Sequence, residues 1–327
     1  MSGNERKTEE VTRDMKQEKR GWNNPFLRIG LALFVMTILV NAVQYGMAFL
    51  IKKTVPEFAD SSWYMYALVI VSTYLVGAPV AMMMMRSLPV IDKEKRERKP
   101  LKWYTLPLLL GASFLAMYVF SAIGVLINFL IGKLMGGTSL NPLAATLGGS
   151  ALIPTVITVA ICAPIVEEFL FRGVVLERLR VYGDLVAIFV SALCFGLLHG
   201  NIQQILYATA LGTVFGYVKV RTNDLRYTIG LHMAVNLIGS VVIANLALTG
   251  NQYIIMVAGM LILGICMVGL VAVILGFALK WVDFTKFSKG EIILEHPMGK
   301  IFGNIGMILY LLISIASCVM VILSMRG

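Results

Sequence analysis

The sequence predicts an all-α protein that crosses a membrane several times. Of its 327 residues, 58% are hydrophobic and only 14% are charged, whereas an ordinary soluble domain is roughly 45–50% apolar and about 25% charged. Uncharged stretches long enough to cross a bilayer core, which takes about 20 residues, recur along the whole chain. A soluble domain could not bury so many apolar side chains, so we expect a polytopic bundle of transmembrane helices.

These uncharged stretches predict eight or nine membrane spans. The stretch 227–279 is too long for one crossing, and the turn sequence Thr249-Gly250-Asn251-Gln252 divides it. The stretch 185–218 divides at Gly200-Asn201 into two shorter helices. In chain order, the nine expected spans are 29–51, 63–85, 105–131, 150–172, 185–199, 202–218, 228–248, 253–279 and 301–325.

The basic residues predict how these spans are oriented. With a cytosolic N-terminus and nine spans, 24 of the 28 Lys and Arg residues fall in cytosolic segments and 4 in outside segments. This is the bias that the positive-inside rule describes, and it places the C-terminus outside. The net charge of +10 therefore reflects membrane topology, and we expect no nucleic-acid partner.

Four regions follow from this reading. Residues 1–26 are a charged cytosolic tail without the apolar segment of a signal peptide, and residues 27–149 hold the first membrane helices. Residues 150–248 form the core that carries the polar motifs, and residues 249–327 form the last helices. No soluble catalytic domain separates them, so any chemistry must take place within the bundle.

The sulfur-containing residues point to packing rather than to metal binding. Cys162, Cys194, Cys266 and Cys318 stand singly in apolar stretches, without the paired spacing of a redox or zinc site. The 19 Met residues, including the run 82–85, could ligate copper through soft thioethers. Packing and lipid contact explain them more simply.

The first candidate site segment is Glu167-Glu168 followed by Arg172. An ionisable side chain near the bilayer centre costs about 2.5–3.5 kcal/mol on insertion scales, so its presence suggests a function. Glu168 and Arg172 are four residues apart and can pair on one helix face. Glu167 points about 100° away and stays available as a base. The alternative is that all three mark the cytosolic interface and snorkel into water.

Two further segments place polar side chains in predicted spans. Phe195 and His199 lie four residues apart at the end of one apolar stretch, and His232 and Asn236 share a face of a later span. A lone membrane histidine usually hydrogen-bonds a neighbouring helix. Two of the three histidines nevertheless lie in spans beside polar residues, while His296 lies in a loop.

A hairpin around Gly183 predicts that Glu167 and His199 meet. Gly183 is the midpoint of the two residues, so both would lie about 24 Å from the hairpin tip at 1.5 Å per residue. His232 lies only about 9 Å from the start of its own helix by the same rise. The tip must therefore project beyond the membrane, although the apolar stretch 185–193 opposes this.

Glu-Glu-x-x-x-Arg at 167–172, Phe-x-x-x-His at 195–199 and His-x-x-x-Asn at 232–236, in this order, resemble the motifs of the CAAX protease and bacteriocin-processing (CPBP, Abi-like) family of intramembrane proteases. The resemblance covers roughly residues 160–240. It implies that Glu167 and His199 activate a water molecule, while His232 and Asn236 stabilise the oxyanion. Arg172 and Phe195 are then structural or electrostatic.

The resemblance leaves metal dependence open. The family is often described as metalloproteases, and Glu167, His199 and His232 could form a zinc site with Glu168 as the base. The zincin motif HExxH is missing, and asparagine is a poor zinc ligand. We therefore favour chemistry without a cofactor.

The sequence thus predicts an endopeptidase of the cell membrane that cleaves a peptide near its cytosolic face. Its expected partners are membrane lipids and a peptide or lipidated-protein substrate, and the family includes proteins of CAAX processing and of bacteriocin immunity. Two alternatives remain. One is a proton-coupled transporter that uses the intramembrane Glu, His and Arg as a relay, and the other is a non-catalytic immunity or scaffold protein.

Overall fold

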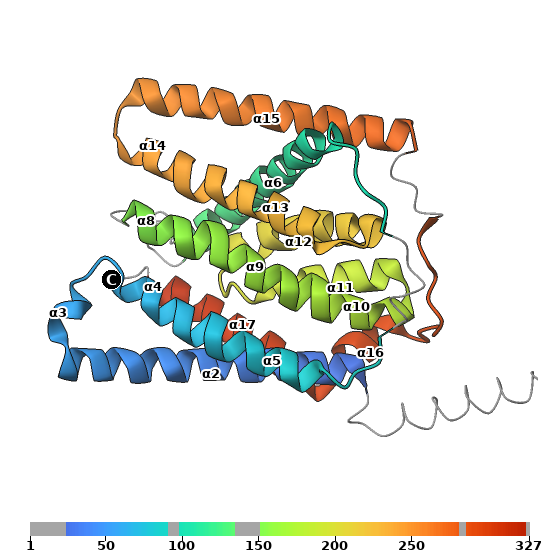
Figure 1. The fold of residues 1–327 in the computed structure, drawn as a ribbon, viewed down its shortest axis with the longest axis horizontal. Helices are drawn as coiled ribbons and strands as arrows, with labels where there is room; N and C mark the ends of the chain where they lie inside the picture. Colours follow the sequence, from blue (N-terminus) through green and yellow to red (C-terminus); the bar gives the residue numbers. More distant parts are fainter. Residues whose placement is uncertain (1–23, 91–97, 135–150, 281–285, 325–327) are drawn as a thin grey trace, which may run out of the picture.

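The computed structural model describes residues 24–90, 98–134, 151–280 and 286–324, and it contains helices but no strands within them. The long helices lie beside one another (Figure 1), and seven of them are long and apolar enough to cross a membrane. The predicted all-α membrane bundle is confirmed. In chain order the helices are α2 (Pro25–Thr54), α3 (Pro56–Ala59), α4 (Tyr64–Val69), η2 (Ile70–Gly77), α5 (Ala78–Met85), α6 (Thr105–Leu134), α8 (Leu152–Thr155), η4 (Val156–Cys162), α9 (Ala163–Glu168), η5 (Phe169–Val175), α10 (Leu176–Leu179), η6 (Arg180–Tyr182), α11 (Asp184–Leu197), α12 (Ile202–Thr222), α13 (Leu225–Val235), η7 (Asn236–Ile243), α14 (Ala244–Leu248), α15 (Gln252–Ala278), α16 (Pro297–Phe302) and α17 (Ile305–Ser324).

Seven of the nine expected spans correspond to these seven helices or runs of joined helical segments. The other two, 185–199 and 202–218, form the helices α11 and α12, which are not among the seven. Two boundaries of the expected spans also need correction. The fourth continues from Leu152 to Tyr182 instead of ending at 172, because charged residues beyond 172 are buried by neighbouring helices. The ninth begins at Ile305, after the separate helix α16. Most of the predicted tail 1–26 lies outside the described residues, and Pro25 already begins α2.

Several spans change locally from α-helix to the wider π-helix. Two of these π segments, η2 and η4, end directly before Ala78-Pro79 and Ala163-Pro164. Proline has no N–H and clashes with the preceding turn, so the helix widens there. The segment α9, which ends with the two glutamates, therefore lies between the π segments η4 and η5. Such π segments occur often at functional sites.

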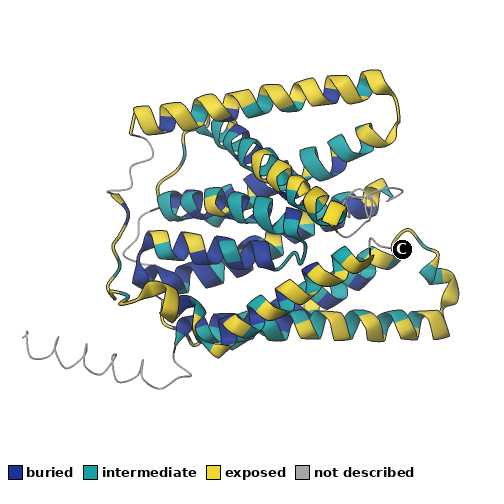
Figure 2. Ribbon diagram, turned by 180° about the vertical axis from the view of Figure 1, so that it is seen from behind, coloured by how far each residue is buried: buried dark blue, intermediate teal, exposed yellow. Residues whose placement is uncertain are grey.

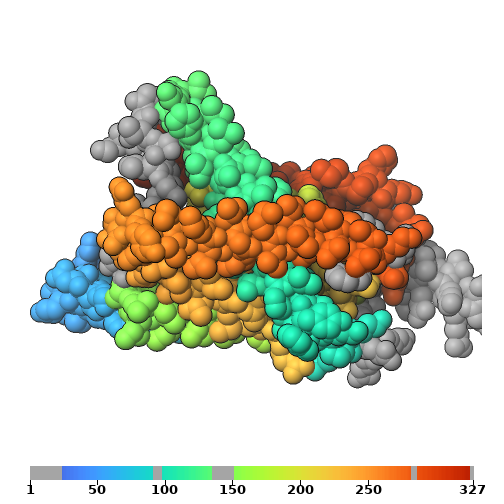
Figure 3. Space-filling view, turned by 90° about the horizontal axis from the view of Figure 1, so that it is seen from above, coloured from blue at the N-terminus to red at the C-terminus, as the bar shows by residue number. Residues whose placement is uncertain are grey.

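Glycines allow two pairs of outer helices to approach closely. A Cβ on Gly30 would lie 2.3 Å from the backbone of Gly306, so α2 and α17 pack backbone to backbone. The same holds where α6 crosses under α15 (Figure 3), since a Cβ on Gly269 would lie 2.1 Å from the oxygen of Gly111. Small residues at such crossings are typical of helix association in membranes.

Burial is highest in the central helices and lowest in the outer ones. Figure 2 shows mostly buried residues in the central layer and mostly exposed residues along α15 and the distal half of α2. The exposed side chains of α15 are largely apolar, including Met260 and Leu263. A helix that is apolar all round and exposed on its outer face is suited to contact with lipid.

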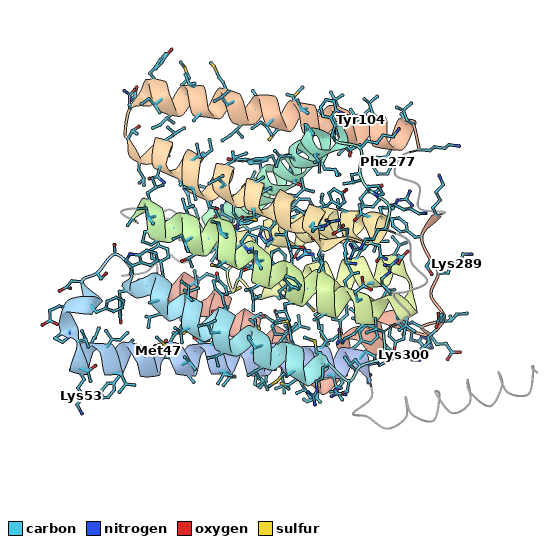
Figure 4. All side chains as sticks on the ribbon, viewed as in Figure 1. Met47, Lys53, Tyr104, Phe277, Lys289 and Lys300 are labelled. Atoms are coloured by element: carbon cyan, nitrogen blue, oxygen red, sulfur yellow. The ribbon has the colours of Figure 1, made fainter. Side chains whose placement is uncertain are left out.

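The two ends of the bundle differ in charge. Figure 4 shows Lys289 and Lys300 at one end and Lys53 at the other. The end with Lys289 and Lys300 also holds the first residues of α2, α6 and α13 (Figure 1). We call it the basic end, because Lys289 and Lys300 lie there.

The hairpin between η6 and α11 lies at the basic end, as predicted. Gly183 adopts a φ of 104°, which favours glycine. The backbone of 288–292 crosses this tip, because Asp184 N donates to Ser288 O at 3.0 Å and Glu291 N donates to Val181 O at 2.8 Å. The tip is therefore fixed to the segment that follows α15.

Four buried charged side chains stabilise this tip, and we call them the basic-end cluster: Glu177, Arg180, Asp184 and Lys219. Arg180 Nε lies 2.9 Å from Asp184 Oδ1, and Lys219 Nζ binds Glu177 Oε1 at 2.5 Å. Most of the apolar stretch 185–193 is buried in α11, at Ala187, Ile188, Val190 and Ala192 among others. Leu185 and Phe189 in the same stretch are 51% and 52% exposed, so its outer face stays apolar and still opposes a tip that projects beyond the membrane.

Candidate active site

The predicted pair of Glu168 and Arg172 is present and fully buried. Arg172 Nη1 lies 3.0 Å from Glu168 Oε1, and neither side chain has any exposed surface. Glu168 ends α9 and Arg172 lies in η5, so the pairing crosses from the α to the π segment. A buried charge without a partner is strongly unfavourable, so each side chain depends on the other.

His232 joins this pair to Glu167. Its Nδ1 lies 3.0 Å from Glu168 Oε1, and its Nε2 lies 3.7 Å from Glu167 Oε2. The side chain of Glu167 is 18% exposed, whereas those of Glu168 and His232 are 0% and 4% exposed. We call Glu167, Glu168, Arg172 and His232 the site cluster. Only Glu167 in this cluster is open to an incoming molecule.

Two phenylalanines enclose the charged part of the cluster. The guanidinium carbon of Arg172 lies 4.5 Å from the ring centroid of Phe195 and 5.6 Å from that of Phe215. Within the described residues, Arg172 Nε and Nη2 have no hydrogen-bond partner, so cation–π contacts stabilise much of this group. Phe195 was predicted to be structural or electrostatic, and its contact with the guanidinium is of that kind. Phe215 adds a second ring.

His199 reaches the same cluster through Phe195. Its ring centroid is 5.1 Å from that of Phe195, and the ring of His232 is 5.7 Å from Phe195. Nδ1 of His199 lies 3.0 Å from the Phe195 carbonyl oxygen. A carbonyl only accepts, so this Nδ1 carries a hydrogen, and in the neutral tautomer with that hydrogen Nε2 is an acceptor.

Asn236 stands at the first position of η7, one turn after His232. Its Nδ2 donates to the carbonyl of Val159 in η4 at 2.9 Å. This contact fixes the amide next to the π segment that precedes the glutamates, and it uses one of the two Nδ2 hydrogens. The sequence placed Asn236 on the face of His232 but did not predict this partner.

The start of α13 is fixed by Asp224, which positions His232 two turns later. Asp224 accepts from Arg226 N at 2.9 Å and forms an ion pair with the Arg226 guanidinium. The hydrogen bond to Arg226 holds the pKa of Asp224 below its usual range. An N-cap of this kind satisfies an N–H group that the helix leaves free.

Close packing of α11 on α12 brings the aromatic rings onto the charges. A Cβ on Gly212 would lie 2.9 Å from Ala192 Cα and 3.0 Å from Arg172 Nη2. Gly212 and Gly216 are four residues apart on α12, a spacing typical of closely packed membrane helices. This spacing is visible in the sequence and could have indicated that α12, with Phe215, lies against the site.

The described residues contain no group of three His, Cys, Asp or Glu side chains arranged to hold a metal ion. The set Glu167, His199 and His232 is not among such groups, although Nε2 of His232, the nitrogen that does not contact Glu168, lies 3.7 Å from Glu167 Oε2. We derive no step through a metal ion. Metal dependence stays a prediction.

Residues 149–238, which include every residue of the three motifs, match the family model of the type II CAAX prenyl endopeptidases, Rce1-like. The predicted resemblance to the CAAX protease family is confirmed. The chain is also 27% identical over 225 residues to the "Membrane-embedded CAAX protease MroQ" of Staphylococcus aureus (strain USA300), which covers 65% of this chain and 88% of MroQ.

A second relative aligns over a shorter stretch. The chain is 30% identical over 86 residues to the "Putative membrane peptidase YdiL" of Bacillus subtilis (strain 168), covering 26% of this chain and 35% of YdiL. No solved structure matches the chain. Together with the helical bundle, the CAAX protease resemblance supports an integral membrane protein of the intramembrane endopeptidase class.

Proposed function

We propose that this chain hydrolyses a peptide bond with Glu167 as the general base. The observation that carries the proposal is the position of His232, which lies between the partly exposed Glu167 and the buried Glu168. A base must be reachable by water and held in place. Glu167 meets both conditions, whereas Glu168 is enclosed.

The charges of the site cluster support this role. Arg172 neutralises Glu168, so Glu167 and His232 remain, with one proton to share between them. With that proton on His232, Glu167 is a carboxylate and the imidazolium balances it. With the proton on Glu167, both groups are neutral. The cluster has no net charge in either state, which suits a site of low dielectric constant.

The hydrolysis then proceeds in two steps. Glu167 takes a proton from water while the water oxygen bonds to the carbonyl carbon, and the carbonyl electron pair moves to the oxygen. His232 Nε2–H and the second Asn236 hydrogen donate to that oxyanion, which fixed donors stabilise strongly in a dry site. The C–N bond then breaks, and Glu167 returns the proton to the leaving amine. His199 Nε2 accepts the other hydrogen of the attacking water.

The helix that carries the glutamates also has an apolar outer face. Ile157, Ile161, Ile165 and Phe169 follow one another at four-residue spacing, and each is 37–49% exposed. They form an apolar stripe on η4, α9 and η5 that is suited to contact with lipid and lies on the side of the helix away from Glu167. We propose a lipidated or strongly apolar peptide segment as the substrate, in line with the CAAX proteases.

The site lies about two helical turns from the basic end along α13. Leu225 and His232 are seven residues apart, which is about 10 Å at 1.5 Å per residue. We propose that the basic end faces the cytosol of a cell membrane, so that cleavage takes place near the cytosolic face. A reporter fused after Arg326 should then read outside, and a reporter in 86–102 should read cytosolic. A cytosolic C-terminus would contradict the orientation.

The decisive experiment removes each chemical group in turn. Glu167→Ala, His199→Ala and His232→Ala should each lower the rate of peptide cleavage on the order of 10²–10⁴-fold. This is the usual contribution of a group that acts as an acid or base. Membrane insertion should be unchanged. The matched control is His296→Ala, because His296 is exposed at the start of α16. This variant should cleave the peptide at the wild-type rate. Wild-type rates in all three site variants would refute the proposal.

A further inference from the structure

Three polar side chains at the start of α12 form a directed chain of hydrogen bonds. Asn201 caps the helix, and its Oδ1 accepts from Gln204 N at 2.9 Å. Asn201 Nδ2 then donates to Gln204 Oε1. Gln204 Nε2 donates to the Tyr207 hydroxyl oxygen at 3.1 Å.

The direction of each bond is fixed by the one before it. A backbone N–H only donates, so the oxygen of the Asn201 amide must face Gln204 N and its nitrogen must face the Gln204 side chain. Gln204 therefore presents its oxygen to Asn201 and its nitrogen to Tyr207. As a result, the Tyr207 oxygen accepts, and its own hydrogen is left to donate elsewhere. Within the described residues that hydrogen has no acceptor.

Tyr207 is placed to use this hydrogen in the site. The chain of bonds begins at Asn201, two residues after His199, and ends at Tyr207, nearly two helical turns further along α12. The ring of Tyr207 is partly buried and packs against both apolar cores of the molecule, which holds it on the inner side of α12. Each core contributes one phenylalanine to the site, Phe195 and Phe215, and their ring centroids lie 5.7 and 5.2 Å from that of His232.

We propose that Tyr207 is a further catalytic residue, whose hydroxyl donates a hydrogen bond to the oxyanion of the scissile carbonyl, with Gln204 and Asn201 as positioning residues. The inference rests on the proposed peptidase function. Of the other two donors, His232 is shared between two carboxylates and Asn236 gives one hydrogen to Val159 O. A neutral phenol in a dry pocket adds a donor without adding charge.

The test is Tyr207→Phe, which removes the hydroxyl and keeps the ring. Cleavage is followed with two quenched-fluorescence peptides in vesicles, one with a farnesylated cysteine three residues from its C-terminus and one apolar and unprenylated. We expect kcat to fall on the order of 10²–10³-fold, the usual loss for one oxyanion donor. KM should change little, because the bond forms mainly in the transition state.

Gln204→Leu tests the orienting chain. It should lower kcat less than Tyr207→Phe does, and the double variant should match Tyr207→Phe alone, since both changes act through one hydroxyl. Additive losses would overturn the role of Gln204. Tyr310→Phe is the matched control, because the buried Tyr310 hydroxyl donates to Cys194 O at 2.8 Å. It should lower thermal stability and leave kcat unchanged.

The pH profile and a parallel Glu167→Gln variant separate the possible outcomes. Loss of an oxyanion donor lowers kcat at every pH, whereas loss of a hydrogen bond to Glu167 would move the acidic limb of the profile and overturn the oxyanion role. Wild-type kcat in Tyr207→Phe together with an inactive Glu167→Gln would refute the Tyr207 assignment alone. Activity in Glu167→Gln, or no cleavage by the wild-type chain, would refute the peptidase proposal itself.

Discussion

The helix from Leu152 to Tyr182 carries two buried clusters of charge, and they differ in what their groups can do. The site cluster and the basic-end cluster are centred on Glu168 and Glu177, nine residues apart, or about 13 Å along the helix. In both clusters an acidic side chain pairs with a basic one, and the paired side chains expose almost no surface. Burial of charge is therefore common to both and does not by itself identify the catalytic one.

The difference lies in the partners. The basic-end cluster contains only Glu, Asp, Arg and Lys, and Asp184 Oδ2 also accepts from Ser288 N at 2.9 Å, which ties the cluster to the backbone. The site cluster contains an imidazole, whose two ring nitrogens can each donate or accept a hydrogen, and the partly exposed Glu167. We infer that a buried ion pair is useful for proton transfer when it holds such a group against one that substrate can reach.

The sharpest test of the site cluster as an ion pair is a double-mutant cycle at Arg172 and Glu168. Arg172→Ala should destabilise the protein by roughly 3–5 kcal/mol, because it leaves a buried carboxylate uncompensated. Arg172→Ala combined with Glu168→Gln should recover much of this loss in thermal unfolding in detergent. Cleavage should not recover, because His232 still lacks the Glu168 carboxylate. Purely additive stability losses would show that the two charges are independent.

The same substitution in the two clusters should separate catalysis from stability. Glu168→Gln should lower cleavage per folded molecule by on the order of 10²-fold, since a neutral amide no longer favours the protonated imidazole. Glu177→Gln should lower thermal stability and leave cleavage per folded molecule close to wild type. The measurements are melting temperature and single-turnover cleavage of both variants. Equal losses of cleavage would mean that the basic-end cluster also belongs to the machinery.

The smallest expected effect is that of metal removal. If the site cluster alone activates water, the purified protein should keep its activity in a strong chelator and contain no stoichiometric zinc by elemental analysis. The carboxylate and imidazole already supply a base and an oxyanion donor, so no metal-bound water is required. One zinc per chain, with activity lost on chelation and restored by zinc, would reverse this expectation.

The sequence alone determined the class of protein and the local relations within each helix. Composition and the repeat of apolar stretches established a helical membrane bundle, because lipid permits few other structures. The four-residue spacing placed Glu168 beside Arg172, since helical geometry fixes such neighbours whatever the rest of the chain does. A glycine between polar residues located the turn at Gly183 for the same local reason.

Only the tertiary structure decided which of these helices meet. His232 binds Glu168 across 64 residues of sequence and Asn236 binds Val159 across 77, and neither partner follows from helix periodicity. The fourth helix extends to Tyr182 because α12 supplies Lys219 to Glu177 and the segment after α15 covers the tip. Periodicity fixes the face on which a side chain lies, but the partner across an interface depends on how closely the two backbones approach, which here depends on glycines such as Gly212.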